Sequence, residues 1–239
     1  MELRRFFVDA SNCIGDKIII TGDEFLHLKN VLRMKLGFKL IVCLNDGNEK
    51  FCEIVEIQND SAIVKVEKTV RKDTKKNYIT LFPAVLKNNK LDYVIQKAVE
   101  LGVDEIIPFT SQNCNETKFN EERANRIALE SAKQCGSATL TVVKPMINFD
   151  NVISKFEEFD NIIMPYEDET QKSFQNSNFI GHKHAVIIGS EGGFTKEEVD
   201  LAKNHNAQIV SLGSRILRAD TASIVSVALL MNELGELAR

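Results

Sequence analysis

The stretch IVSLGSRILRADTASIVSVALLM occupies residues 209–231 and joins an apolar, strand-like run to a long apolar helix. Between the two lie a glycine, Gly213, and two arginines, Arg215 and Arg218. Asp220 or Thr221 can cap the helix, because short polar side chains accept hydrogen bonds from its first free N–H groups. Capping gives no reason for the two arginines. The junction is therefore a candidate site rather than a simple turn.

A second strand-to-helix junction lies just before it, in AVIIGSEGGFTKEEVDLAK (residues 185–203). An apolar strand ends at Gly189, a glycine loop follows, and Thr195 with Glu198 has the spacing of a capping box. Glycines at a strand end let a ligand approach the backbone closely. The loop lacks both G-K-[ST] and G-x-G-x-x-G, which argues against a P-loop and against a dinucleotide enzyme. Glu191 would repel phosphate, so a neutral or cationic ligand fits better.

The two junctions are expected at one edge of a parallel sheet. The segments YITLFPAVL (78–86), NKLDYVIQKAVELGV (89–103) and DEIIPFTS (104–111) form a strand, a helix and a strand. Such a β-α-β unit implies parallel pairing. Ligands of open α/β sheets bind beyond the carboxyl ends of the strands, where both glycine loops would lie. We expect an α/β domain over residues 78–239.

Residues 1–70 have a different sequence pattern, in which short strand-like runs separated by turn residues predict a small β-barrel-like domain. Its one helical segment, residues 21–37, would begin at Thr21 with a capping-box Glu24 and end at Gly37. Residues 71–77 are predicted to be a linker. They belong to a basic block, because residues 65–90 hold eight Lys or Arg and two acids.

Composition limits the classes of protein. The 239 residues are 44% hydrophobic and 27% charged, with a net charge of −4, so any contact with nucleic acid must be local. Five cysteines without a C-x-x-C pair favour reduced thiols over disulfides or zinc, and we expect no metal. No run of about 18 apolar residues occurs. We expect a soluble, cytoplasmic protein without a membrane segment.

The two junctions strongly resemble the C-terminal motifs of the RsmE family, the 16S ribosomal RNA uridine N3 methyltransferases of the SPOUT superfamily. The resemblance extends through QKAVELGVDEIIPF, ERANRIALESAKQC, RRFFV and HLKNVLRMKLG, in the same order, and covers nearly the whole chain. It implies a PUA-like N-terminal domain, a SPOUT domain with a C-terminal trefoil knot, a homodimer, and S-adenosylmethionine as methyl donor. The implied partner is 16S rRNA within the small ribosomal subunit.

The resemblance also assigns roles to residues. Arg218 would face the target uridine, and Glu191 is a second catalytic candidate that could equally face the sulfonium or anchor its own loop. The implied cofactor-binding residues are Ile188, Gly189, Glu191, Gly192, Gly193, Leu212, Gly213, Ile216 and Leu217. The RNA-binding candidates are Arg4, Arg5, His27, Lys29, Arg33, Arg123, Arg126 and Arg215.

Four positions depart from the family pattern. Asp220 stands where glutamate is common, Ser190 where proline is frequent, and Asn113 and Ser137 where arginines are expected. The last two put RNA contacts of the middle segment in doubt. Two alternatives stay open: a methyltransferase of another RNA target, and a ribosome-assembly protein that binds RNA without catalysis. Intact glycines in both loops argue against the second.

Overall fold

The computed structural model describes residues 3–72, 75–87, 89–174, 177 and 179–237. The chain divides into two compact units, residues 1–74 with 132–140, and residues 75–131 with 141–239. The segment 132–140, which the sequence placed in the second domain, groups with the first unit. Asp73 and Thr74 of the expected linker lie outside the described residues.

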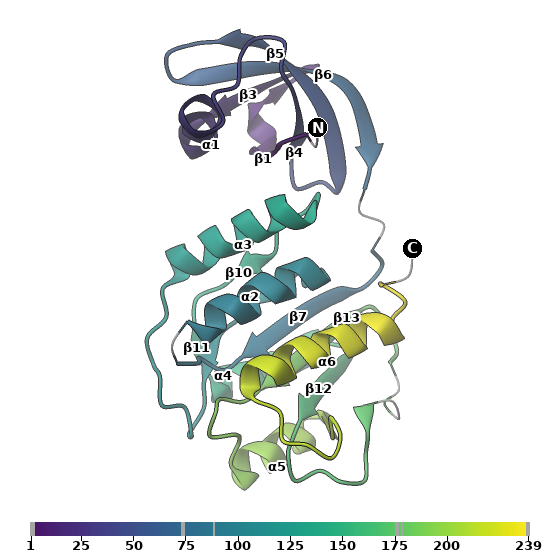
Figure 1. Cartoon of the computed structure of the whole chain (residues 1–239). Coiled ribbons are helices and arrows are strands. Elements are labelled where there is room, and N and C mark those ends of the chain that lie inside the picture. The colour runs from purple at the N-terminus through teal and green to yellow at the C-terminus, as the bar shows by residue number, and fades with distance from the viewer. Residues whose placement is uncertain (1–2, 73–74, 88, 175–176, 178, 238–239) are drawn as a thin grey trace. The chain divides into compact units, whose positions relative to one another are not determined.

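The first unit is built on a six-stranded sheet of order β1-β4-β5-β6-β3-β2 (Figure 1). β1 runs parallel to β4, and the other neighbours are antiparallel. A core that includes Phe6, Phe25, Leu28 and Leu40 packs against it. The strands are β1 (Arg5–Phe7), β2 (Cys13–Ile14), β3 (Lys17–Thr21), β4 (Lys39–Cys43), β5 (Asn48–Ile57) and β6 (Ser61–Arg71), with a 3₁₀ turn, η1, at Ala10–Asn12.

The helix of this unit is shorter than its sequence suggests. α1 covers Gly22–Leu26 and continues as a π-helical turn, η2, over His27–Val31, so it ends well before Gly37. The side chain of Thr21 makes no capping hydrogen bond, and Gly22 has φ +59°. The predicted capping box is therefore wrong, because the chain enters the helix through a left-handed glycine. Phe25 and Leu28 of this segment are buried, and Leu32 is partly buried against the same core.

The second unit contains the parallel sheet that the sequence predicted, with strand order β10-β8-β7-β13-β12-β14. All of its pairings are parallel. The strands are β7 (Tyr78–Pro83), β8 (Glu105–Ile106), β10 (Val142–Val143), β12 (Asn161–Pro165), β13 (Lys183–Ile188) and β14 (Gln208–Val210). The predicted strand over residues 104–111 is divided, because β9 (Phe109–Thr110) pairs with β11 (Ile147–Asn148) in a separate small sheet.

Helices cover both faces of this sheet. α2 (Lys90–Leu101) packs beside α6 (Ala219–Glu233) on one face, and α4 (Phe149–Ser154), η3 (Phe156–Glu158) and α5 (Lys196–Asn204) lie against the other (Figure 1). α3 (Glu121–Cys135) begins in this unit, and its last residues group with the first unit. α2 confirms the helix predicted within residues 89–103. It buries Leu91, Val94, Ile95, Ala98 and Val99, and Gly102 ends it at φ +90°.

Candidate active site

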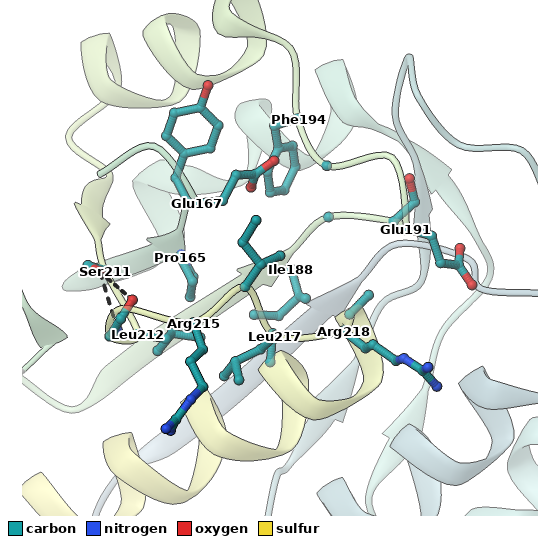
Figure 2. A pocket seen from close by; sticks show the side chains of 18 of the residues that line it. Pro165, Glu167, Ile188, Glu191, Phe194, Ser211, Leu212, Arg215, Leu217 and Arg218 are labelled. Carbon is teal, nitrogen blue, oxygen red and sulfur yellow. Dashed lines mark hydrogen bonds between the residues drawn. The ribbon is translucent and has the colours of Figure 1, made fainter. Parts of the chain in front are cut away.

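A cavity of about 300 Å³ lies at the carboxyl ends of β12, β13 and β14, which are neighbours in the sheet (Figure 2). Three chain segments line it: residues 165–167 at the end of β12, 188–191 and 193–194 at the end of β13, and 211–219 after β14. Parallel strands end at the same edge, so segments distant in sequence meet there. The two glycine loops thus share one pocket, with the β12 segment placed between them.

The loop after β13 is held in a shape that only glycine permits. A Cβ atom on Gly189 would lie 3.0 Å from the Phe194 ring, and one on Gly192 would lie 2.8 Å from the carbonyl oxygen of Asn113. Gly193 has φ +66°, and its N–H donates to the carbonyl of Ser190 at 3.0 Å. The capping box of Thr195 and Glu198 is present, as predicted, and fixes the start of α5. Sterics on both sides therefore determine the course of the loop.

Asn113 clamps the same loop from outside the pocket. Its side-chain amide donates to the Gly192 carbonyl, and the Ser190 hydroxyl donates to the Asn113 carbonyl, both at 3.0 Å. Gly192 therefore lies behind the loop and does not line the cavity, in contrast to the other cofactor-binding residues predicted from the resemblance. Two of the four positions that depart from the family pattern, Asn113 and Ser190, form this clamp.

Glu191 has the contacts of a loop anchor. Its carboxylate pairs with Lys90 at 3.2 Å and accepts from the backbone N–H of Lys87 at 3.3 Å. Partial burial would raise the pKa of Glu191, but hydrogen bonds from backbone N–H groups and from Lys90 outweigh it and hold that pKa below its ordinary value. A paired carboxylate with a lowered pKa is a poor base. Of the two roles that the sequence left open, these contacts favour the anchor.

The loop after β14 turns sharply at Gly213, whose φ of +112° is unfavourable for other residues. The Ser211 hydroxyl accepts from the Gly213 N–H at 3.2 Å and stabilises the turn. The helix then begins at Ala219, because the Arg218 carbonyl accepts the first helical bond, from Ala222. The predicted caps are therefore wrong. Asp220 already lies in the first turn, and no side chain of the described residues caps the start of this helix.

Arg215, Ile216 and Arg218 line the pocket with exposed side chains. Ile216 is 86% exposed. Within the described residues neither arginine has an acidic partner at salt-bridge distance, and Figure 2 places Arg218 on the same side of the pocket as Glu191. The site therefore combines an apolar interior, formed by side chains such as Ile188 and Leu217, with uncompensated positive charge at its rim.

None of the other RNA-binding candidates lines this pocket. Arg5 is 10% exposed and pairs with Glu49 at 2.7 Å, so its position in β1 gives it a structural role within the first unit. The Lys29 ammonium lies 5.2 Å from the Phe25 ring centroid and donates to a backbone carbonyl. Arg33 adopts φ +50°, a conformation that is uncommon for a side-chain-bearing residue.

The candidates on α3 are exposed but are engaged in ion pairs. Arg123 pairs with Asp92 at 2.6 Å, and Arg126 pairs with Glu122 at 3.3 Å. Exposed pairs of this kind are weak, and each arginine can exchange its partner for a phosphate at little cost. Both therefore stay predictions.

The sequence interpretation missed the third segment of the pocket, Pro165, Tyr166 and Glu167. The apolar run NIIMP is typical of a strand, and parallel pairing alone places its carboxyl end at the same edge. Asn113 and Lys90 were missed as supports of the glycine loop. Their contacts reach across 79 and 101 residues of sequence and leave no local signal.

Fold and site together define a class: a parallel α/β domain that binds a small ligand in loops at the carboxyl edge of its sheet. Comparison with known families identifies the class more closely. A family model described as "RNA methyltransferase domain" matches residues 73–231, and one described as "RNA methyltransferase PUA domain" matches residues 20–67.

Within the described residues no helix could span a membrane, and no cluster of His, Cys, Asp or Glu could hold a metal ion.

Individual relatives and solved structures are similar to this chain over nearly its whole length. Ribosomal RNA small subunit methyltransferase E 2 of Borreliella burgdorferi is 32% identical over 91% of this chain and 92% of its own. The crystal structure of a probable rRNA-methyltransferase from Porphyromonas gingivalis has a TM-score of 0.82 at 26% identity, over 99% of this chain and 100% of that one. A ribosomal RNA small subunit methyltransferase E from Neisseria gonorrhoeae, solved bound to S-adenosyl methionine, has a TM-score of 0.86 at 24% identity, over 97% of this chain and 98% of that one.

The chain belongs to the RNA methyltransferase family that includes ribosomal RNA small subunit methyltransferase E. The resemblance drawn from its C-terminal motifs is confirmed, as is the combination of a PUA-like domain with a methyltransferase domain. The trefoil knot stays a prediction.

Proposed function

We propose that this protein uses S-adenosylmethionine to methylate N3 of a uridine in the 16S rRNA of the small ribosomal subunit. The observation that carries the proposal is the pocket at the carboxyl edge, where two glycine loops converge beside Arg218, which has no acidic partner among the described residues. The relatives named ribosomal RNA small subunit methyltransferase E support the rRNA target. The uridine and its N3 position come from the resemblance of the motifs.

The pocket residues fit this cofactor. The cavity of about 300 Å³ is at the small end of the range for ligand sites, and its apolar side chains suit a planar adenine. Gly189 and Gly213 bring backbone groups to its wall without side chains in the way. The site carries no lysine or arginine in the glycine loop, which fits a cofactor without phosphate. When bound, S-adenosylmethionine supplies an electrophilic methyl group.

Arg218 is the proposed catalytic residue. Methylation at N3 requires loss of the imide proton, which spreads negative charge onto the neighbouring carbonyl oxygens of the uracil. A guanidinium that faces these oxygens would stabilise the charge as it develops. Arg218 lines the pocket at the N-terminus of α6, and among the described residues it has no acidic partner to compete for it. Glu191 is proposed as the anchor that keeps the glycine loop in place.

RNA affinity would come from basic side chains that contact phosphates. Arg4, His27, Lys29 and Arg33 of the first unit are proposed for this role, together with Arg123, Arg126 and Arg215. Arg5 is left out, because its charge is already neutralised by Glu49. The net charge of −4 favours an assembled subunit over bare RNA as the substrate, and the protein would act in the cytoplasm.

A homodimer is also proposed. α6 carries apolar residues around its whole circumference, and Ile224, Val225 and Leu229 are only partly buried within one chain. A second copy that packs on this helix would cover them. The mass in solution, measured by light scattering, tests this point, and a monomer would contradict it.

Methyl transfer tests the proposed function. Labelled methyl from S-adenosylmethionine would be offered to small subunits that lack the modification, with free 16S rRNA and transfer RNA in parallel. We expect label on a uridine N3 in the subunits alone. Label on another base or on ribose would show that the methylated position is not a uridine N3. Binding of the cofactor without transfer to any substrate would contradict the catalytic assignment.

A further inference from the structure

Glu167 is an acidic residue in the pocket to which neither the motifs nor the proposed mechanism gives a role. It follows β12, the central strand of the three that end at the pocket, and its side chain lines the cavity. Its carboxylate lies over the glycine loop, because a Cβ atom on Gly193 would be 2.5 Å from Oε1 of Glu167. The carboxylate is therefore directed into the pocket and not away from the protein.

The two carboxylates of the pocket differ in their partners. Glu191 is paired with Lys90 and bonded to a backbone N–H. Glu167 has no hydrogen bond or ion pair with any of the described residues, although two cationic side chains, Arg215 and Arg218, line the same cavity. A carboxylate that faces a ligand site with all its acceptor positions free is available to donors of the ligand.

Figure 2 places Glu167 beside Phe194, across Ile188 from Arg218 and Glu191. If Arg218 marks the end of the pocket where the methyl group meets the RNA, Glu167 marks the opposite, nucleoside end. The nucleoside half of S-adenosylmethionine offers two vicinal ribose hydroxyls as donors. The two oxygens of one carboxylate can accept from both. In dinucleotide-binding sheets an acidic residue likewise accepts from the ribose 2′ hydroxyl.

We infer that Glu167 accepts hydrogen bonds from the 2′ and 3′ hydroxyls of the cofactor ribose and makes the site selective for ribonucleosides. The inference rests on the proposed function, because it requires that S-adenosylmethionine occupies this pocket. It also explains Gly193. A side chain there would be strained at φ +66° and would displace the Glu167 carboxylate from the pocket.

The test is calorimetric titration of the full-length protein with S-adenosylhomocysteine, the cofactor product, and with its 2′-deoxy and 3′-deoxy analogues. We expect Glu167→Ala to weaken binding of S-adenosylhomocysteine about tenfold to hundredfold, the range for a charged hydrogen bond. Glu167→Gln should fall between Ala and wild type, because it keeps one acceptor oxygen. Against at least one deoxy analogue the loss from Glu167→Ala should largely disappear, because that analogue lacks the donor.

Asp200→Ala is the matched control, since it removes one exposed acid that lies in the same unit but does not line the pocket. It should bind all three ligands as the wild type does. Unchanged affinity of Glu167→Ala for S-adenosylhomocysteine would overturn the inference. So would an equal loss for all three ligands, which would indicate that Glu167 contacts the amino-acid part or only shapes the loop. A wild-type protein that binds none of them would instead contradict the proposed function itself.

Discussion

The amino and carboxyl edges of the parallel sheet differ in whether their polar side chains have partners within the protein. At the amino ends of β7, β12 and β13, Asn77, Asn161 and His184 form a continuous hydrogen-bonded chain. At the carboxyl ends, Glu167, Arg215 and Arg218 face a cavity without ionic partners among the described residues. The amino edge satisfies these polar groups internally, whereas the carboxyl edge leaves these three charged side chains available to a ligand. Stability and function are thus separated along the length of each strand.

The amino edge is specified in detail. Nδ2 of Asn161 donates to the Ile180 carbonyl and to Nδ1 of His184, the latter at 3.0 Å. Nδ1 must therefore be an acceptor, and the imidazole is neutral with its proton on Nε2, which faces Oδ1 of Asn77 at 3.2 Å. Oε1 of Glu236 accepts from both N–H groups of Asn77 and ties the residues after α6 to the start of β7. Glu236, Asn77, His184 and Asn161 are thus linked in series, and each hydrogen-bonds to the next.

Among the substitutions that test the difference between the two edges, Arg218→Ala at the carboxyl edge should have the largest effect, and that effect should be on methyl transfer. Loss of a donor that stabilises charge in the transition state should lower kcat/KM for methyl transfer about 100-fold or more. The free energy of unfolding should change by less than about 0.5 kcal/mol, because the side chain is exposed. Lys196→Ala removes a positive charge outside the pocket and is the control. Transfer at the wild-type rate by Arg218→Ala would remove Arg218 from the mechanism.

A smaller effect is expected from Gly192→Ala. The new Cβ would lie 2.8 Å from the Asn113 carbonyl oxygen and 2.9 Å from its Cβ, so the loop must shift at a cost of about 1–3 kcal/mol. We expect about tenfold weaker binding of S-adenosylhomocysteine by calorimetry. Ser214→Ala, which removes one atom from the facing loop, should bind nearly as the wild type does. Normal affinity of Gly192→Ala would show that the clamp does not position the loop.

At the amino edge the expected effect is on stability and depends on pH. Burial lowers the pKa of His184 below its ordinary value of 6.5, so the unfolded chain takes up a proton more readily than the folded one. The stabilising contribution is complete above pH 6.5 and is lost as the pH falls toward the lower pKa of the folded state. Urea titrations of wild type and His184→Gln between pH 5 and 8 measure this loss.

The variant should lack the part of the acid dependence that belongs to His184. The exposed His205 is the matched control, and His205→Gln should keep the wild-type dependence. Identical profiles for wild type and His184→Gln would mean that the imidazole can be protonated in place.

The smallest effect is expected from Glu236→Gln. The amide keeps an acceptor oxygen but loses the charge, and we expect a loss of about 0.5–1.5 kcal/mol in the free energy of unfolding. Binding of S-adenosylhomocysteine should not change, because Glu236 is at the amino edge. Glu233→Gln, which alters an exposed acid in the last turn of α6, is the comparison. Weaker ligand binding by Glu236→Gln would show that the two edges are not independent.

Local signals predicted most of this architecture. The helix predicted within residues 89–103 and the capping box of α5 depend on residues a few positions apart, and both are present. Local reasoning failed where the backbone had alternatives. Thr21 has the spacing of a cap, yet the left-handed Gly22 leads the chain into the helix instead.

The site was predicted in part. Parallel strand order brings two glycine loops to one edge, and this could be inferred from the β-α-β pattern. The β12 segment between them, and the Asn113 and Lys90 contacts behind them, depend on pairings across long stretches of chain. Glu167 is the clearest case. Nothing in NIIMPYEDE (residues 161–169) distinguishes its carboxylate from those of Asp168 and Glu169 until the fold places it over Gly193.

Hydrogen–deuterium exchange with and without S-adenosylmethionine tests the division between the two edges most directly. We predict slower exchange on cofactor addition in residues 165–167, 188–194 and 211–219, and unchanged exchange around Asn77, Asn161 and His184. Protection centred on the amino edge, or no protection in the three loops at saturating cofactor, would contradict the assignment of the pocket.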